Sequence, residues 1–446
     1  MKIVIIGAGE VGFELASMLS KEEHDVCVVD NNIDQINNVR EKLDAKVVFG
    51  SGTNARALEE AGISQADLFI AVSSVDEVNI MSCLLAKEYG VARSVARALN
   101  SDYVLDGSKI NGLKLGIEKI VNPLKVVSEE VSKLCDFSDV SEIARFFDDQ
   151  LLHLGYPVKE DNPFIGSKLA GMSFIKGEKK IVVTSLCRAD ETFVPNKNEV
   201  IQQGDMIFFF CQKKDLKSVR KHFGVKSHGT KNIFIIGGGR TGYQVAKSLE
   251  ETNHKVKVFD KNREICNRIA NDLNVDVFCT ENTDVETLED EGIAKADVVI
   301  SMMKDDYSNI LTSLLAKKLG AFKVVSLVNS QKLSGLAYSL GVDSTISPRL
   351  ATASSILKYI RRGNIVSVVE KGSSELIEVE ITESSDLAKN KIKDIKRPSG
   401  VIFGGVRRGN NIFLLSGDDQ LRQGDYLVAY CLSDSISKLE KLIELS

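Results

Sequence analysis

The sequence lacks a long apolar run, a signal peptide and an excess of positive charge. Its apolar runs, such as residues 3–6 and 206–211, are far shorter than the roughly 18–20 residues of a membrane-spanning helix. The N-terminus leads directly into a predicted strand. The formal net charge of -5 gives no general attraction to nucleic acid or to an anionic membrane. We therefore expect a cytoplasmic protein without a nucleic-acid partner.

Metal-binding and redox patterns are also missing. The five histidines are scattered without ligand spacing, which argues against a zinc site. None of the eight cysteines forms a C-x-x-C pair, and most lie among apolar neighbours, as Cys27 does between two valines. We interpret them as small buried side chains and predict no metal.

What the sequence does contain is an internal repeat at an offset of 230 residues. Residues 2–12 read KIVIIGAGEVG, and residues 232–242 read NIFIIGGGRTG. Residues 79–90 match residues 309–320 at seven of twelve positions without a gap. Agreement held over about 90 residues indicates tandem duplication of a whole domain, not a short solenoid repeat.

The first part of each repeat alternates strands and helices. In the first copy the predicted strands cover 2–6, 25–29, 46–49, 68–72 and 94–98, and helices are predicted over 11–19, 34–43, 55–61 and 79–89. This alternation is typical of an α/β fold with a doubly wound, Rossmann-like parallel sheet.

The second part of each repeat is less well preserved. Gly204-Asp205 and Gly424-Asp425 each precede an apolar run, and we interpret both regions as small α+β domains. The 446 residues suit about three or four domains. The predicted boundaries are 1–138 and 231–355 for the two Rossmann domains, 139–222 and 364–446 for the small domains, and 223–230 for a linker.

A dinucleotide motif opens each Rossmann domain. Residues 7–12 (GAGEVG) follow a strand and begin a helix. The first glycine allows a tight turn, the second lets the backbone approach a pyrophosphate, and the third lets helix and strand pack closely. Asp30 ends the second strand, where a carboxylate suits the ribose hydroxyls. Because the set recurs at 237–242 with Asp260, we expect nucleotide binding, with a vestigial loop in one copy as the alternative.

The two sites are predicted to be unequal. Asp30 and Asp260 would repel a 2′-phosphate, which favours NAD(H) or adenosine phosphates over NADP(H). Lys261 and Arg263 could accommodate a phosphate at the second site, but we interpret them as solvated charges at the start of a helix. The fourth loop position is Glu10 in the first copy and Arg240 in the second. Arg97 on the fifth strand corresponds to Leu327, so a phosphate ligand at this position is expected in the first site alone.

Catalytic groups are not evident. A dehydrogenase needs a proton-transfer group beside the nicotinamide, and no histidine recurs in both copies at a useful place. Nucleotide binding without such groups indicates a sensor, not an enzyme, with an NAD-dependent oxidoreductase as the alternative.

Taken together, these motifs resemble the tandem RCK (KTN) domain family. The resemblance covers essentially the whole chain and depends on KIVIIGAGEVG, on residues 66–87 (ADLFIAVSSVDEVNIMSCLLAK), on the second copy and on the Gly-Asp pairs of the small domains. It implies a peripheral regulatory protein on the inner face of the cell membrane. Such proteins form a homo-oligomeric gating ring, a dimer or tetramer, under a membrane potassium-translocating subunit and respond to NAD(H) or ATP/ADP. A sensor of another channel or antiporter is the remaining alternative.

The motif and the resemblance together predict the binding residues. In the first copy these are Gly7, Ala8, Gly9, Glu10, Val11, Gly12, Asp30, Asn31, Gly52, Thr53, Ser73, Ser74 and Arg97. In the second copy they are Gly237, Gly238, Gly239, Arg240, Thr241, Gly242, Asp260, Glu281, Met302 and Met303. The family commonly has a Gly-Asp turn after the third strand, whereas this chain has residues 50–52 (GSG) and 280–282 (TEN), so ribose binding there departs from the pattern.

Overall fold

The structure is a computed structural model that divides into two compact units. It describes every residue except 23, 104–111, 138, 170–173, 176–177, 190, 225–230, 253, 282–283, 361–364, 372–373, 384, 389 and 445–446. The first unit comprises Met1–Glu129 with Ser347–Arg361, and the second comprises Glu130–Ile346 with Arg362–Ser446. Most of the predicted linker 223–230 lies outside the described residues, as does position 282 of the TEN segment.

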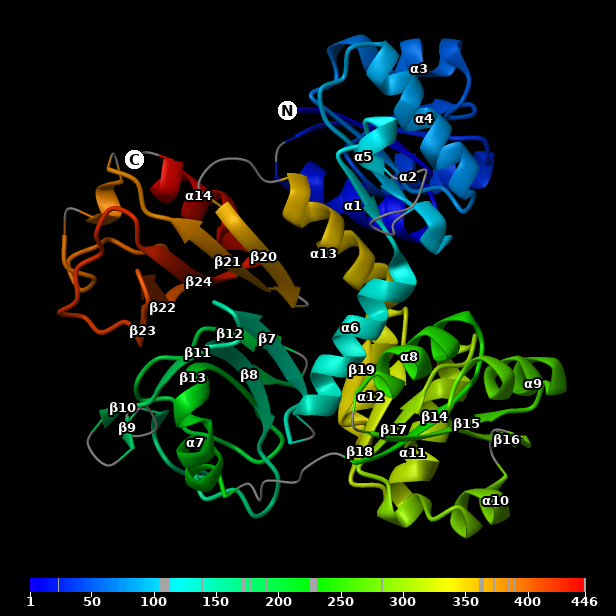
Figure 1. The fold of residues 1–446 in the computed structure, drawn as a ribbon. Coiled ribbons are helices and arrows are strands. Elements are labelled where there is room, and N and C mark those ends of the chain that lie inside the picture. The colour runs from blue at the N-terminus through cyan, green and yellow to red at the C-terminus, as the bar shows by residue number, and fades with distance from the viewer. Residues whose placement is uncertain are drawn as a thin grey trace. The chain divides into compact units, whose positions relative to one another are not determined.

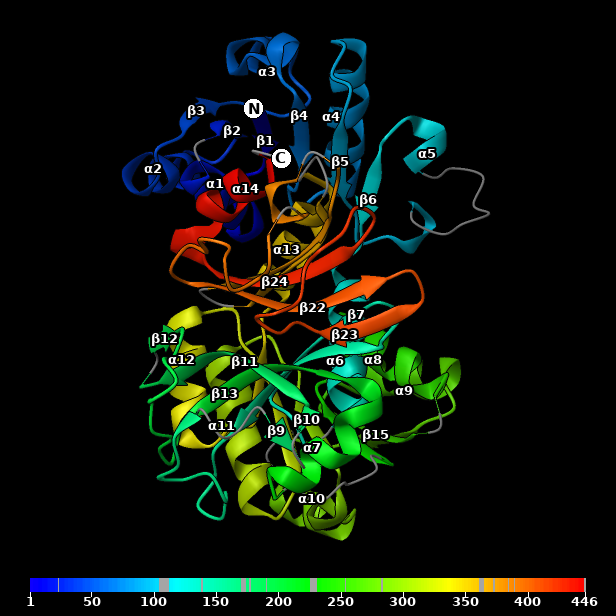
Figure 2. The same ribbon diagram turned by 90° about the vertical axis from the view of Figure 1, so that its left-hand side faces the viewer.

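The first Rossmann domain has a six-stranded parallel sheet in the order β3-β2-β1-β4-β5-β6. This order confirms the predicted doubly wound sheet. Figure 2 shows α4 alongside β4 and β5. The strands are β1 Lys2–Ile6, β2 Asp25–Asp30, β3 Lys46–Phe49, β4 Leu68–Ala71, β5 Ser94–Arg97 and β6 Lys119–Val121. The helices are α1 Glu10–Lys21, α2 Ile33–Lys42, α3 Ala55–Ala61, α4 Asp76–Glu88, α5 Gly112–Leu115 and α6 Pro123–Asp136.

A helix from the second repeat completes the core of this domain. Helix α13 (Pro348–Ile360) lies against α1 in Figure 1. Its Ala353, Ile356 and Leu357 are buried together with Leu15 of α1 and the β1 side chains. The predicted second Rossmann domain extends to residue 355, but this helix covers an apolar face of the first domain instead.

The second Rossmann domain repeats the sheet in the order β16-β15-β14-β17-β18-β19. Its strands are β14 Asn232–Ile236, β15 Lys255–Asp260, β16 Asp276–Cys279, β17 Val298–Ser301, β18 Lys323–Leu327 and β19 Ser344–Ile346. Its helices are α8 Arg240–Glu250, α9 Arg263–Asp272, α10 Val285–Asp290, α11 Asp306–Lys318 and α12 Gln331–Leu340. None of the helices in the described part of the chain has both the length and the apolar composition of a membrane span.

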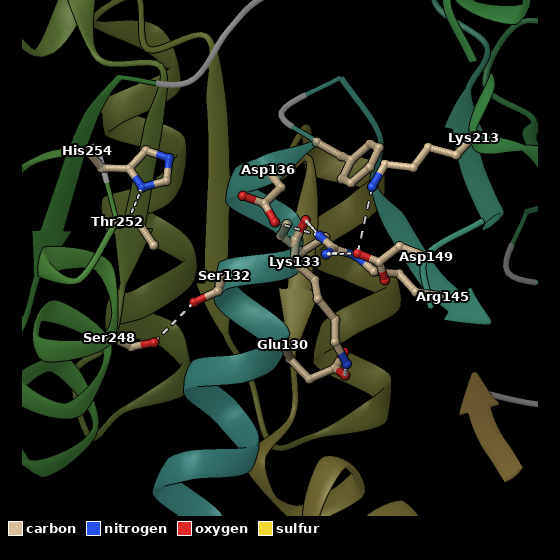
Figure 3. Close-up of polar contacts among 12 residues, drawn as sticks. Glu130, Ser132, Lys133, Asp136, Arg145, Asp149, Lys213, Ser248, Thr252 and His254 are labelled. Carbon is tan, nitrogen blue, oxygen red and sulfur yellow. Dashed lines mark hydrogen bonds and ion pairs between the residues drawn. The ribbon is translucent and has the colours of Figure 1, made fainter. Parts of the chain in front are cut away.

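The C-terminal half of α6, from Glu130 to Asp136, belongs to the second unit, where polar side chains hold it. Arg145 of β7 (Glu142–Phe146) donates to Asp136 at 2.7 Å and to Asp149 at 3.2 Å, as Figure 3 shows. The hydroxyl of Ser132 lies 3.4 Å from that of Ser248 on α8. A buried lysine lies at the C-terminus of α6. Lys323 Nζ donates to the carbonyl oxygens of Leu134, Phe137 and Val140 at 3.2, 3.2 and 2.6 Å. A cation at a helix C-terminus satisfies carbonyls that have no partner within the helix.

The two small domains are antiparallel sheets with short helices. The strands of the first are β7 Glu142–Phe146, β8 Leu151–Pro157, β9 Phe174–Ile175, β10 Glu178–Lys179, β11 Ile181–Arg188, β12 Glu191–Phe193 and β13 Met206–Gln212, and its helix is α7 Leu216–His222. Those of the second are β20 Ile365–Lys371, β21 Ser374–Glu380, β22 Val401–Arg408, β23 Asn411–Leu414 and β24 Tyr426–Leu432, and its helix is α14 Ile436–Glu444. Figure 2 shows β22 and β23 facing the sheet of β7, β11 and β13. Phe210 and Tyr430 are buried in one cluster between the sheets.

The Gly-Asp pairs noted in the sequence serve these small domains. Asp205 and Asp425 are each 1% exposed and each accept two bonds from one arginine, Arg188 at 2.7 and 2.8 Å and Arg408 at 2.8 and 2.7 Å. A buried carboxylate needs such a partner, because burial without one costs several kcal/mol. The repeated aspartate therefore has a structural role in each small domain.

Candidate nucleotide-binding site

The glycine loop has the geometry that its motif predicts. Gly7 has φ +100°, and its N–H donates to Val29 at 2.9 Å. A Cβ at Gly7 would lie 2.8 Å from the backbone nitrogen of Ser73, and one at Gly12 would lie 1.8 Å from the Gly7 oxygen. Neither position has room for a side chain, so the tight turn depends on glycine at both. The N-terminus of α1 follows directly on the loop.

Asp30 at the end of β2 holds this loop. Its Oδ2 accepts the N–H of Ala8 at 2.6 Å, and its Oδ1 accepts the N–H of Asn32 at 2.7 Å. A carboxylate has about four acceptor positions, so two remain for a ligand. In the second copy Asp260 accepts from Gly238 at 2.7 Å and from Asn262 at 2.8 Å.

A buried asparagine ties together the two strand ends beside the loop, and the sequence interpretation missed it. Asn79 of α4 accepts from Ser73 N at 2.8 Å and donates to the carbonyls of Ser73 and Arg97 at 3.0 and 2.9 Å. Asn309 makes the same three bonds to Met303 and Leu327. The recurrence of this asparagine at 79 and 309 in the two repeats is the signal that could have identified it.

A cavity of about 540 Å³ lies at the carboxyl ends of the strands of the first Rossmann domain. This is where open α/β sheets bind ligands. Ten predicted residues line it: Gly7, Gly9, Glu10, Val11, Asp30, Asn31, Gly52, Ser73, Ser74 and Arg97. The sequence interpretation missed Asn32, Gln35, Val75 and Val78, which line it too. Their contact with a nucleotide remains a prediction.

Three predicted residues lie behind or beside the cavity lining. Ala8 is fully buried, and it contributes its N–H to Asp30. Gly12 is buried where α1 meets the loop. Thr53 is exposed, and its hydroxyl lies 2.9 Å from that of Ser51. For Ala8 and Gly12 the structure therefore indicates support of the loop.

Arg97 is the cation of the cavity. Its Nη1 donates to the Ser73 carbonyl at 3.2 Å, and its buried Nε has no hydrogen-bond partner among the described residues. Burial lowers the pKa of Arg97, while Asp76 and Glu10 act to raise it. A buried guanidinium N–H without a partner costs free energy, and a guanidinium that lines the cavity suits an anionic ligand.

The second site has different side chains at the corresponding positions. Arg240 is exposed at the first residue of α8, and Leu327 is buried where the first site has Arg97. Met303 occupies the position of Ser73, whereas Met302 is only 4% exposed and packs in the core as Val72 does. Glu281 is exposed, and its Oε2 lies 3.8 Å from Lys261 Nζ. The two sites thus have glycine loops of the same form but differ in the charges of the side chains around them.

Comparison with protein families matches both halves of the chain. The model described as the TrkA-N domain matches residues 3–123 and 233–348, and the TrkA-C domain matches 154–224 and 376–444. The Trk system potassium uptake protein TrkA of Azorhizobium caulinodans is 32% identical over 454 residues, covering 100% of this chain and 99% of the relative. TrkA of Halomonas elongata is 30% identical over 452 residues with the same coverage.

Solved structures share the fold. The GsuK RCK domain has a TM-score of 0.58 at 19% identity, covering 100% of this chain and 95% of that one. The GsuK channel bound to NAD has a TM-score of 0.59 at 19% identity, with 100% and 79% coverage. GsuK bound to ADP has a TM-score of 0.51 at 18% identity, with 81% and 69% coverage. The predicted tandem RCK fold is confirmed, and the chain belongs to the TrkA family of Trk system potassium uptake proteins.

Proposed function

We propose that the chain is a peripheral regulatory subunit of a Trk-type potassium transporter, and that nucleotide bound to its Rossmann domains gates potassium transport allosterically. Similarity over the full length to Trk system TrkA proteins supports the transport role. The observation that carries nucleotide control is the cavity of about 540 Å³ bounded by the glycine loop, Asp30 and Arg97.

The chemistry of the cavity favours NAD(H), with ATP/ADP as the second choice. Asp30 presents free acceptor positions toward ribose hydroxyls and would repel a 2′-phosphate. The loop N–H groups, the start of α1 and Arg97 suit a pyrophosphate, which all these ligands contain. The structures of GsuK with NAD and with ADP support the same choice.

The partners follow from the family. We infer a TrkH-like membrane potassium-translocating subunit, against whose cytoplasmic face a homo-oligomer of this chain, a dimer or tetramer, acts as a gating ring. A ligand shifts a gate only through different affinities for its conformations, so the bound nucleotide must favour one arrangement of the ring.

Reconstitution tests this proposal. The chain and the membrane subunit of its own Trk system would be purified together, and potassium flux into proteoliposomes would be measured with NADH, NAD, ATP or ADP. We expect at least one nucleotide to change the flux, and we expect Asp30→Ala to reduce that change. Flux that is the same with and without every nucleotide would contradict the proposal.

The enzyme alternative has its own test. The titratable side chains among the described residues that line the cavity are Glu10, Asp30 and Arg97. We propose that the protein is not an enzyme, because these charged groups suit the binding of ribose hydroxyls and phosphates. Turnover of NADH with a small carbonyl compound, lost in Asp30→Ala, would favour an oxidoreductase instead.

A further inference from the structure

Two cysteines lie next to each other beside Asp260, the carboxylate of the second site. Cys266 is on α9, and its Sγ lies 3.2 Å from the carbonyl oxygen of Asp260 and 3.9 Å from that of Phe278. Cys279 ends β16, where it is the strand partner of Asp260, and its Sγ lies 3.9 Å from the Lys261 carbonyl oxygen. Both sulfur atoms therefore border the backbone at the end of β15.

The two thiols lie at adjacent backbone positions and differ in exposure. Cys266 is 5% exposed, and burial, followed by the neighbouring Cys279 thiol, raises its pKa to about 11. Cys279 is exposed to solvent. An exposed thiol is open to an oxidant, whereas its buried neighbour is protected until the exposed sulfur has reacted.

The pair occurs in one copy of the repeat. Ile36 and Phe49 stand at the corresponding positions of the first Rossmann domain, Ile36 buried in the core and Phe49 exposed. The same fold in the first domain therefore accommodates apolar side chains at these two positions, so the fold alone does not require cysteine at both.

We propose that Cys266 and Cys279 form an oxidisable pair that a peroxide converts into a disulfide at the second nucleotide site. The Cys279 thiol attacks a peroxide oxygen, the O–O bond breaks, and a sulfenic acid and water are formed when the peroxide is hydrogen peroxide. The Cys266 thiol then attacks the sulfenic sulfur, the S–O bond breaks, and the disulfide and a second water are formed. The two thiols lose two electrons, which reduce the peroxide.

The disulfide would alter the support of the glycine loop. It removes the Cys266 S–H bond to the Asp260 carbonyl and joins α9 to the end of β16, where Cys279 is the strand partner of Asp260. Asp260 in turn holds the N–H of Gly238 at 2.7 Å. This consequence rests on the proposed nucleotide function, and we expect oxidation to weaken nucleotide binding at the second site about tenfold, a typical size for coupling between sites.

Mass spectrometry tests the pair independently of nucleotide. The full chain would be treated with hydrogen peroxide, its remaining thiols alkylated, and the protein digested. We expect a peptide pair linked through Cys266 and Cys279 with the loss of two hydrogen atoms, reversed by a thiol reductant. The link should persist in the control Cys187→Ser and disappear in Cys266→Ser and in Cys279→Ser. If the linked peptides do not form in the wild type, or if either cysteine links preferentially to another cysteine, the proposed disulfide is overturned.

A titration separates the two parts of the proposal. Nucleotide binding to reduced and oxidised protein would be compared in Asp30→Ala, which leaves the second site to be observed. A disulfide that forms without changing this affinity would overturn the regulatory consequence. If reduced wild type binds no nucleotide at either site, the proposed function fails, while the linked peptides still decide whether the thiol pair exists.

Discussion

The Oδ2 atom of Asp30 accepts the backbone N–H of Ala8 at 2.6 Å, which joins the end of β2 to the glycine loop. The carboxylate that we propose binds ribose therefore also shapes the glycine loop. Asp260 and Gly238 repeat the relationship at 2.7 Å, so it is a property of both Rossmann domains.

Replacing Asp30 should weaken both the loop and the site. Asp30→Ala removes two acceptors for backbone N–H groups, and we expect the free energy of unfolding to fall by about 1–2 kcal/mol. Thermal melting with and without NADH measures both effects, since stabilisation by the nucleotide should also shrink. The control Asp25→Ala changes an exposed carboxylate at the other end of β2. A variant as stable as the wild type would contradict the role in the loop.

Arg97 should account for much of the phosphate affinity of the first site. Arg97→Leu gives the first site the residue that the second site has at Leu327. We expect affinity for NADH or ADP to fall about 10- to 100-fold, because a charge-assisted bond to phosphate is lost. Calorimetry measures the change, with Arg93→Leu as the control, because Arg93 pairs with Glu118 at 3.2 Å. Equal affinities would show that the phosphates lie elsewhere.

The features predicted well from the sequence are those with a local physical cause. The glycine loop and Asp30 could be predicted because each has a local requirement. A tight turn, a close backbone approach and a carboxylate at a strand end require particular residue types at fixed spacings in the sequence. The doubly wound sheet followed from alternating strand and helix patterns.

Other features depend on what lies across space. The apolar spacing of α13 shows that Ala353 and Ile356 face a core, but the pattern is the same whichever domain supplies that core. Asn79 binds backbone atoms of two strands, and such partners leave no trace in side-chain chemistry. Met302 was predicted as a site residue, but the boundary between core and site lies one residue further along the chain. Sequence patterns do not fix this boundary to within one residue.

The buried Lys323 predicts a pH dependence of stability. Burial lowers its pKa to about 8 from an ordinary value of 10.5. Between these values the unfolded chain binds more protons than the folded chain, so the contribution of Lys323 to the free energy of unfolding rises with pH. Relative to Lys323→Met, the wild type should gain up to about 3 kcal/mol from below pH 8 to above pH 10.5. Urea unfolding of both proteins across this range measures it, and a difference that stays flat or falls would contradict the burial of the charge.

Arg188 and Arg408, which each pair with a buried aspartate, should stabilise the small domains. Arg408→Met leaves Asp425 buried without its cation, and we expect a loss of about 2 kcal/mol in the free energy of unfolding. Arg188→Met should have a similar effect in the first small domain through Asp205. The exposed pair Lys393–Asp418 offers a control, and Lys393→Met should change little. Equal losses in Lys393→Met and Arg408→Met would contradict this distinction.

Two unequal nucleotide sites are the central claim, and calorimetric titration tests it most directly. NADH, NAD, ATP and ADP would each be titrated into wild type, Asp30→Ala, Asp260→Ala and the double variant. We predict binding in the wild type, a different component lost in each single variant, and no specific binding in the double variant. Isotherms that neither aspartate substitution alters would contradict the claim.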